Sequence, residues 1–213
     1  MRFVVIAEGQ SEGAGLGGFL REWLNARLPK RVGVAVQPLK GKDHFLDKIA
    51  PTARLLLNGR RADDIIAVIG LLDLHGLKAP EHLTTVAERV RHHRDDIEAR
   101  VGHPKFRQRF AVHETEAWFL AVPEILPDEV AKAIPPHARS HPERVDSDSP
   151  PAKLLERLYR ERRKETYRKT THTADLLTKL PTTPGAQAEG MTAKCPYLRE
   201  LLDELVSLAC SAA

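Results

Sequence analysis

Ile65-Ile-Ala-Val-Ile-Gly-Leu-Leu-Asp73 is the stretch that decides the fold. It is apolar almost throughout, which is typical of a central strand in a parallel sheet that is buried on both faces. Shorter apolar runs with the same character lie on either side of it along the chain. We expect these runs to form three further strands, at Phe3–Ala7, Val32–Gln37 and Phe106–Val112.

The segments between the expected strands have helical spacing. Apolar residues recur every three or four positions from Leu16 to Leu28, and helices are also expected at about 43–57 and 83–101. Strands that alternate with helices of this length indicate an α/β fold, with a four-stranded, mainly parallel sheet flanked by helices. After Val122 the chain is rich in proline and shows no strand pattern, so we expect an α/β domain at 1–122 and a helical C-terminal extension at 123–213 packed on it.

Composition sets the class of protein without naming a function. The chain has 213 residues, 42% of them hydrophobic and 29% charged, as in ordinary globular proteins. A formal charge of +4 permits a nucleic-acid partner without requiring one. Two cysteines fit neither a disulfide framework nor a CxxC site, and no apolar run approaches a membrane span, so a cytoplasmic location is expected.

Acidic residues follow three of the expected strands. Glu8 comes directly after the first strand and Asp73 ends the third, while Glu114 and Glu116 follow the fourth. The carboxyl ends of parallel strands meet at one edge of a sheet, where ligands bind. Carboxylates brought together there repel one another unless they share a cation. The sequence therefore predicts a site for a hard divalent metal, with Mg²⁺ as the best match to carboxylate ligands.

The chain resembles a Toprim-related family of unknown function, whose bacterial genes tend to lie beside AAA or OLD-type ATPases in defence-like operons. The resemblance spans nearly the whole chain. It is carried by Val-Ile-Ala-Glu8-Gly-Gln-Ser-Glu12, Leu-Leu-Asp73-Leu-His75-Gly-Leu, Val-His113-Glu114-Thr-Glu116-Ala-Trp-Phe-Leu, Ser149-Pro-Pro-Ala-Lys153, Tyr167-Arg-Lys169 and Lys194-Cys195-Pro196.

The resemblance implies a Toprim/Rossmann-like fold and Mg²⁺-dependent phosphoryl transfer. Toprim domains hold the metal with a Glu after the first strand and an Asp-x-Asp after the third, which places Glu8 and Asp73 in those roles. His75 stands where the second Asp is expected, and imidazole suits Mn²⁺ better than Mg²⁺. Glu114 and Glu116 are the candidates for the missing oxygen ligand.

The predicted catalytic set is therefore Glu8, Asp73, His75, Glu114 and Lys169, with Glu8, Asp73, Glu114 and Glu116 as metal ligands. A basic residue helps to neutralise charge on a phosphoryl group, and Lys42 and Arg168 are further candidates for this role. The expected activity is that of a phosphodiesterase or nuclease component acting on nucleic acid, with DNA favoured and an AAA/OLD-type ATPase as a possible partner. Oligomer formation is compatible with the sequence.

Other interpretations remain open. Acids at strand ends also serve as solvated loop residues or helix caps, and Gly13-Ala-Gly15-Leu-Gly-Gly18 formally matches a dinucleotide-binding pattern. The glycines are equally explained by close helix packing. From Lys153 to Lys179, nine Lys or Arg face four Asp or Glu, with Tyr159 and Tyr167 among them, which predicts either a phosphate-binding surface or a solvated helix. A catalytically degenerate module that binds nucleic acid or an ATPase is the alternative to an enzyme, and a nucleotide-sensing regulator is a third possibility.

Overall fold

The computed structural model describes residues 1–144, 149–181 and 185–212, and gives the backbone alone for 10–14 and 185–189. Its centre is a four-stranded sheet in the order β2-β1-β3-β4, in which all three pairings are parallel. The α/β architecture expected from the sequence is confirmed. The strands are β1 (Arg2–Ala7), β2 (Gly33–Pro38), β3 (Ile65–Asp73) and β4 (Phe106–Ala111).

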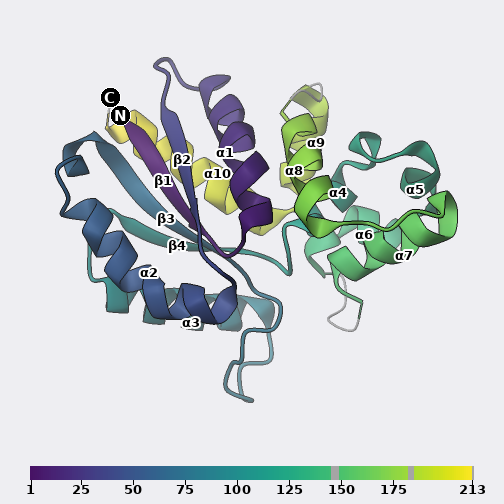
Figure 1. The fold of residues 1–213 in the computed structure, drawn as a ribbon, viewed down its shortest axis with the longest axis horizontal. Coiled ribbons are helices and arrows are strands. Elements are labelled where there is room, and N and C mark those ends of the chain that lie inside the picture. Colours follow the sequence, from purple (N-terminus) through teal and green to yellow (C-terminus); the bar gives the residue numbers. More distant parts are fainter. Residues whose placement is uncertain (145–148, 182–184, 213) are drawn as a thin grey trace.

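Helices cover both faces of this sheet (Figure 1). Alternate residues of β1 divide between two hydrophobic clusters, as the two-residue period of a strand requires. Phe3 and Val5 face a cluster with α1 and α10, whereas Val4 and Ile6 face a cluster with α2 and α3. The bounds of these helices are α1 (Gln10–Asn25), α2 (Lys42–Leu57), α3 (Val86–Val101) and α10 (Pro196–Ser211).

Among the described residues after β4, the regular elements are helices joined by loops. Two 3-10 turns accompany these helices and a third precedes β3, and no described helix is long and apolar enough to cross a membrane. The helices are α4 (Glu116–Ala121), α5 (Asp128–Ala133), α6 (Pro136–Ser140), α7 (Pro151–Arg163), α8 (Lys169–Lys179) and α9 (Gly185–Lys194), and the turns are Ala62–Asp64, Pro123–Ile125 and Pro142–Arg144.

Local sequence explains where the helices begin and end. Thr85 caps α3 by accepting a hydrogen bond from the Glu88 amide, and the Glu88 carboxylate accepts one in return from Thr85. This capping box starts α3 at Val86, slightly later than the position near Leu83 expected from apolar spacing alone. Gly102 ends the helix in the left-handed conformation (φ 62°), which favours glycine.

The later helices share one hydrophobic core with the sheet. The cluster on the α1 face continues without a break into buried residues of α4, α7 and α8. The closest approach is at Gly15 of α1, where a Cβ atom would lie 2.7 Å from the Ala174 carbonyl oxygen and 2.8 Å from Leu177 Cβ. Helix α8 therefore packs directly on α1 because residue 15 has no side chain. The sequence interpretation of the glycine-rich segment is either a dinucleotide-binding pattern or a site of close helix packing. At Gly15, close packing is the reason for the glycine.

We predict that Gly15→Ala destabilises the protein by about 1–3 kcal/mol, because the added methyl group forces α8 away from α1. Gly18→Ala is the matched control. A Cβ there meets nothing within 4 Å, and alanine in a helix interior is favoured over glycine by about 0.5–1 kcal/mol. Urea unfolding of the two variants measures the difference, and equal stabilities would contradict the packing argument.

Candidate functional site

Strand register brings the predicted acidic residues to one edge of the sheet. Ala7 of β1 pairs with Leu71 of β3, and Asp73 at the end of β3 pairs with Ala111 of β4. Beyond the paired residues, the Leu74 amide donates to the Ala111 carbonyl and the His75 amide to the His113 carbonyl. The segments that carry Glu8, Asp73 and Glu114 thus leave the sheet side by side.

Three of the predicted acids surround one lysine. Lys169 Nζ lies 3.4 Å from Asp73 Oδ2, 3.5 Å from Glu114 Oε1 and 3.4 Å from Glu116 Oε2. We call these four residues the carboxylate centre. Lys169 is the first residue of α8, so the packing of α8 on α1 delivers its ammonium to the ends of β3 and β4. The acids come from the α/β part of the chain, and the cation comes from the helical part.

Glu116 is the buried member of the carboxylate centre. Its side chain is fully buried, and its Oε1 accepts hydrogen bonds from the hydroxyls of Thr173 at 3.0 Å and Tyr167 at 3.4 Å. Burial raises the pKa of Glu116, Lys169 opposes this, and the charge of Glu114 adds to the rise. Burial, and then the charge of Glu116, likewise raise the pKa of Tyr167. The interpretation of Glu116 as a solvent-facing residue is excluded.

Asp73 and Glu114 are slightly more open, with side chains 10% and 12% exposed. The second oxygen of Glu114 accepts a hydrogen bond from the Ala152 amide at 3.0 Å. Ala152 lies in the first turn of α7, where backbone amides lack partners within the helix and the helix dipole favours negative charge. Glu114 is therefore positioned by a helix terminus as well as by Lys169.

Glu8 lies next to a second lysine at the same edge. Lys42 Nζ is 4.0 Å from Glu8 Oε2 and donates a hydrogen bond to the His75 carbonyl oxygen. Lys42 is the first residue of α2, so this contact links the ends of β1 and β3 through a helix terminus. The His75 side chain is half-buried, and the hydrogen bonds that the structure describes for this residue are made by its backbone amide and carbonyl.

The carboxylate centre fits a divalent cation in the chemistry of its ligands but not in its present spacing. Among the residues that the structure describes, no group of three or more His, Cys, Asp or Glu side chains is arranged to hold a metal ion. The carboxylate oxygens stand 3.4–3.5 Å from an ammonium nitrogen, whereas Mg²⁺ needs oxygens at about 2.0–2.1 Å. However, one lysine faces three carboxylates, and the buried Glu116 Oε2 accepts no hydrogen bond from the described residues. Hard oxygen ligands with surplus negative charge suit Mg²⁺ or Mn²⁺ once the ammonium moves away.

Sequence reasoning missed the two hydroxyl partners of Glu116. Thr173 follows Lys169 by four residues, so helical spacing would have placed both on one face of α8. Tyr159 and Tyr167, which the sequence places among the basic residues of a possible phosphate-binding surface, are both only 3% exposed. Their ring centroids lie 5.2 Å apart, and each lies within 5.2 Å of the His172 ring, so they join α7 to α8. Glu12, Gly13 and the rest of 10–14 lie outside the residues whose side chains are described.

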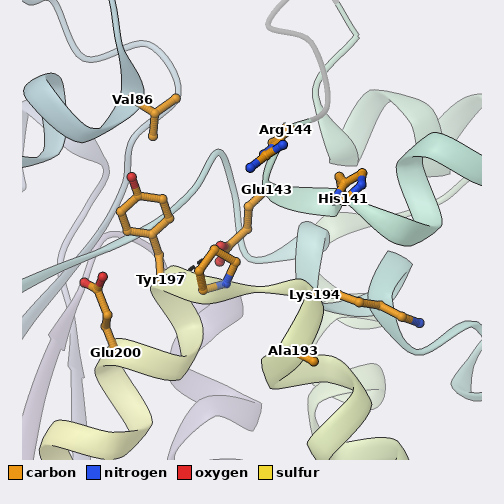
Figure 2. Close-up of a pocket in the computed structure, with 9 residues that line it drawn as sticks. Val86, His141, Glu143, Arg144, Ala193, Lys194, Tyr197 and Glu200 are labelled. Carbon is orange, nitrogen blue, oxygen red and sulfur yellow. Dashed lines mark hydrogen bonds between the residues drawn. The ribbon is translucent and has the colours of Figure 1, made fainter.

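A separate pocket of about 470 Å³ lies between α3, the turn at Pro142–Arg144 and the junction of α9 with α10 (Figure 2). At its base, the buried Glu143 accepts hydrogen bonds from the amides of Tyr197 and Leu198 in the first turn of α10. Burial raises the pKa of Glu143 to about 7, although the two amide hydrogen bonds lower it. Glu143 therefore caps α10 with a carboxyl group that titrates near neutral pH.

The sequence model described as "Domain of unknown function (DUF4276)" matches residues 7–206. No match was found among curated proteins.

Among solved structures, two similar folds are the C-terminal regions of OLD proteins. The one from Burkholderia pseudomallei has 15% identity and a TM-score of 0.44, covering 94% of this chain and 98% of that one. The one from Xanthomonas campestris pv. campestris, phased with mercury, has 14% identity and a TM-score of 0.39, covering 94% and 96%.

The raised pKa of Glu143 predicts a pH-dependent stability. The native state holds the proton more tightly than the unfolded chain, whose glutamate has a pKa near 4.5. The contribution of Glu143 is therefore greatest below pH 4.5 and falls by about 3 kcal/mol as the pH rises to about 7. The difference in unfolding free energy between wild type and Glu143→Gln should decrease over this range. Asp203→Asn, at an exposed acid of the same helix α10, is the control, and a flat difference for Glu143→Gln would contradict the prediction.

Proposed function

The chain belongs to the DUF4276 family, and we propose that it is a divalent-cation-dependent phosphodiesterase that acts on nucleic acid, as the nuclease component of a Toprim-like system. The observation that carries the proposal is the carboxylate centre. Asp73, Glu114 and Glu116 come from the ends of adjacent parallel strands and share one cationic position at the edge where such sheets bind ligands.

Asp73, Glu114 and Glu8 are the residues that would hold Mg²⁺ or Mn²⁺ in this proposal. When bound, such an ion polarises a phosphoryl oxygen and lowers the pKa of water that attacks the phosphorus. Glu116 is anchored by Thr173 and Tyr167 on the buried side, so it fixes the position of α8 relative to the strand ends. Lys169, with its side chain 34% exposed, is the group that leaves the carboxylates when a divalent cation replaces it.

Lys169 and Lys42 supply the positive charge that phosphoryl transfer requires. Both ammonium groups lie at the carboxyl edge of the sheet, beside carboxylates from β1, β3 and the segment after β4. A cation at such a position stabilises the charge that develops on phosphoryl oxygens. In these roles the two lysines would bind the substrate phosphate, and the acids would bind the cation. The chain's resemblance to the Toprim-related family suggests an AAA/OLD-type ATPase as a partner.

A non-enzymatic module is the second candidate, and one feature of the centre favours it. The ammonium of Lys169 already neutralises part of the carboxylate charge, and His75 stands at the position where the Toprim pattern has its second Asp. A centre that permanently keeps its lysine would be a structural ion-pair network. In that case the protein would bind nucleic acid or an ATPase without cleaving a phosphodiester.

We predict that Asp73→Asn and Glu8→Gln each lower the rate of metal-dependent cleavage of nucleic acid by at least about 100-fold, because each removes a carboxylate from the cation site. Cleavage of plasmid and linear DNA in Mg²⁺ or Mn²⁺ measures the rate, with EDTA as the metal-free condition. Asp63→Asn is the matched control, since Asp63 is an exposed acid just before β3, at the opposite edge of the sheet. Cleavage by both site variants at the wild-type rate would refute the assignment.

We also predict that Lys169→Met makes stability depend on divalent cations. Without the ammonium the three carboxylates repel one another, and the cost is smaller than for a fully buried ion pair because solvent reaches Lys169, whose side chain is 34% exposed. Mg²⁺ or Mn²⁺ binds the native state alone, so it should raise the melting temperature of Lys169→Met more than that of wild type.

Thermal unfolding in EDTA and in millimolar Mg²⁺ measures this effect without reference to activity. Lys48→Met, at an exposed lysine of α2, is the control for the substitution itself. An equal shift of the melting temperature in both variants would show that the carboxylate centre does not bind the metal.

A further inference from the structure

Three basic side chains lie on one face of α7, and a fourth follows at its C-cap. Lys153, Arg157 and Arg160 follow one another at intervals of four and three residues, which is the spacing of a single helix face. Lys164 is the C-cap residue, and all four side chains are exposed. We call them the basic stripe. The opposite face of α7 is buried in the core through Leu154, Leu155, Leu158 and Tyr159. Packing of α7 thus fixes the stripe toward solvent.

The basic stripe begins at the carboxylate centre. The amide of Ala152 donates to Glu114 Oε2, and Lys153 is the next residue of the helix. From Lys153 to Arg163, the last residue of α7, the helix rises by about 15 Å. Phosphates of one strand of B-DNA are spaced by about 3.4 Å along the helix axis, so this length matches about four phosphates. The stripe therefore leads away from the proposed cleavage site over the length of a short stretch of backbone.

The four basic side chains of the stripe outnumber the two acids that lie beside them, Glu156 and Glu161. Within the described ranges, no ion pair joins any of the four side chains to an Asp or Glu. Arg163, just outside the stripe, shows the contrast: it pairs with Glu165 at 3.0 Å and with Glu129 at 3.6 Å. If α7 were only a solvated helix stabilised by ion pairs, its other arginines would be expected to pair with acids as Arg163 does.

No aromatic ring lies on the basic stripe. Proteins that bind single strands stack bases on exposed aromatic side chains. Here all six Phe and both Trp are buried, and Tyr159 and Tyr167 are buried against each other beneath α7 and α8. The remaining tyrosine, Tyr197, lines the pocket beside α10. The chemistry of the stripe is thus that of backbone phosphate contacts alone.

We infer that the basic stripe binds the phosphate backbone of duplex nucleic acid and holds it against the carboxylate centre. The inference rests on the proposed function in taking nucleic acid as the substrate, and it adds the surface, the duplex form and the lack of sequence preference. Contacts limited to phosphates give affinity without reading bases. They also make the affinity fall with salt, with a slope of about −0.9 per phosphate contact in a plot of log K against log salt.

The test is duplex binding by Arg157→Gln/Arg160→Gln, measured by fluorescence anisotropy with a labelled 20-base-pair DNA in EDTA. The double variant should bind at least about tenfold more weakly at 0.1 M salt, and its salt slope should be shallower by about 2. Arg60→Gln/Arg61→Gln is the matched control. It removes the same charge from exposed residues just before β3, at the far edge of the sheet, and should bind as wild type does.

Three outcomes would overturn the inference: equal affinity of the two double variants, absence of duplex binding by wild type, and tighter binding of a single strand of the same sequence.

A duplex RNA of the same length shows whether the protein prefers DNA or RNA. Loss of affinity in the stripe variant on either duplex supports the backbone contact. Asp73→Asn distinguishes the two proposals. If it binds duplex as wild type does but fails to cleave, both stand, whereas stripe-dependent binding without cleavage by wild type removes only the phosphodiesterase.

Discussion

The ammonium of Lys169 lies among the carboxylates of Asp73, Glu114 and Glu116, and their mutual repulsion makes this one cation the condition for the geometry of the site. Parallel strands bring acids to the edge of the sheet wherever the sequence puts them after a strand. What the strands cannot supply is the balancing charge. The chain provides it from α8, far along the sequence, and the electrostatics of the edge thereby depend on the docking of the helical region.

The helical region docks on the sheet through the hydrophobic core rather than through a surface contact. The hydrophobic cluster on the α1 face of the sheet includes buried residues of α4, α7 and α8, and Gly15 lets α8 approach α1 closely enough for contact between backbones. Two polar links reinforce it at the site itself: Thr173 to Glu116, and the Ala152 amide to Glu114. A change that separates α8 from α1 therefore also moves a cation away from three acids. Stability and the chemistry of the centre are coupled through the same contacts.

The sequence was sufficient for the sheet and for the positions of the acids, because both depend on local patterns. The apolar run ending in Asp73 predicts a buried parallel strand, and β3 is that strand. Helix α4 was not predicted because its first residue, Glu116, looked like a second loop acid, and only the tertiary contacts with Thr173 and Tyr167 show why a carboxyl group is buried there. Aromatic residues interleaved with basic ones predicted either a phosphate-binding surface or a solvated helix. Helical periodicity places Tyr159 on the face of Leu155 and Leu158, and this face is the buried one.

The three acids of the centre are not equivalent, and their difference decides what each can do. Glu116 is fully buried and accepts hydrogen bonds from two hydroxyls, and burial raises its pKa. The side chains of Asp73 and Glu114 are 10% and 12% exposed, and Glu8 stands at the end of the neighbouring strand beside Lys42. The acids that would hold a cation are therefore those that solvent reaches, while Glu116 links the centre to α8 through Thr173. The basic stripe begins one residue after Ala152, whose amide holds Glu114, so one helix terminus would position both the carboxylate and the phosphate-binding surface.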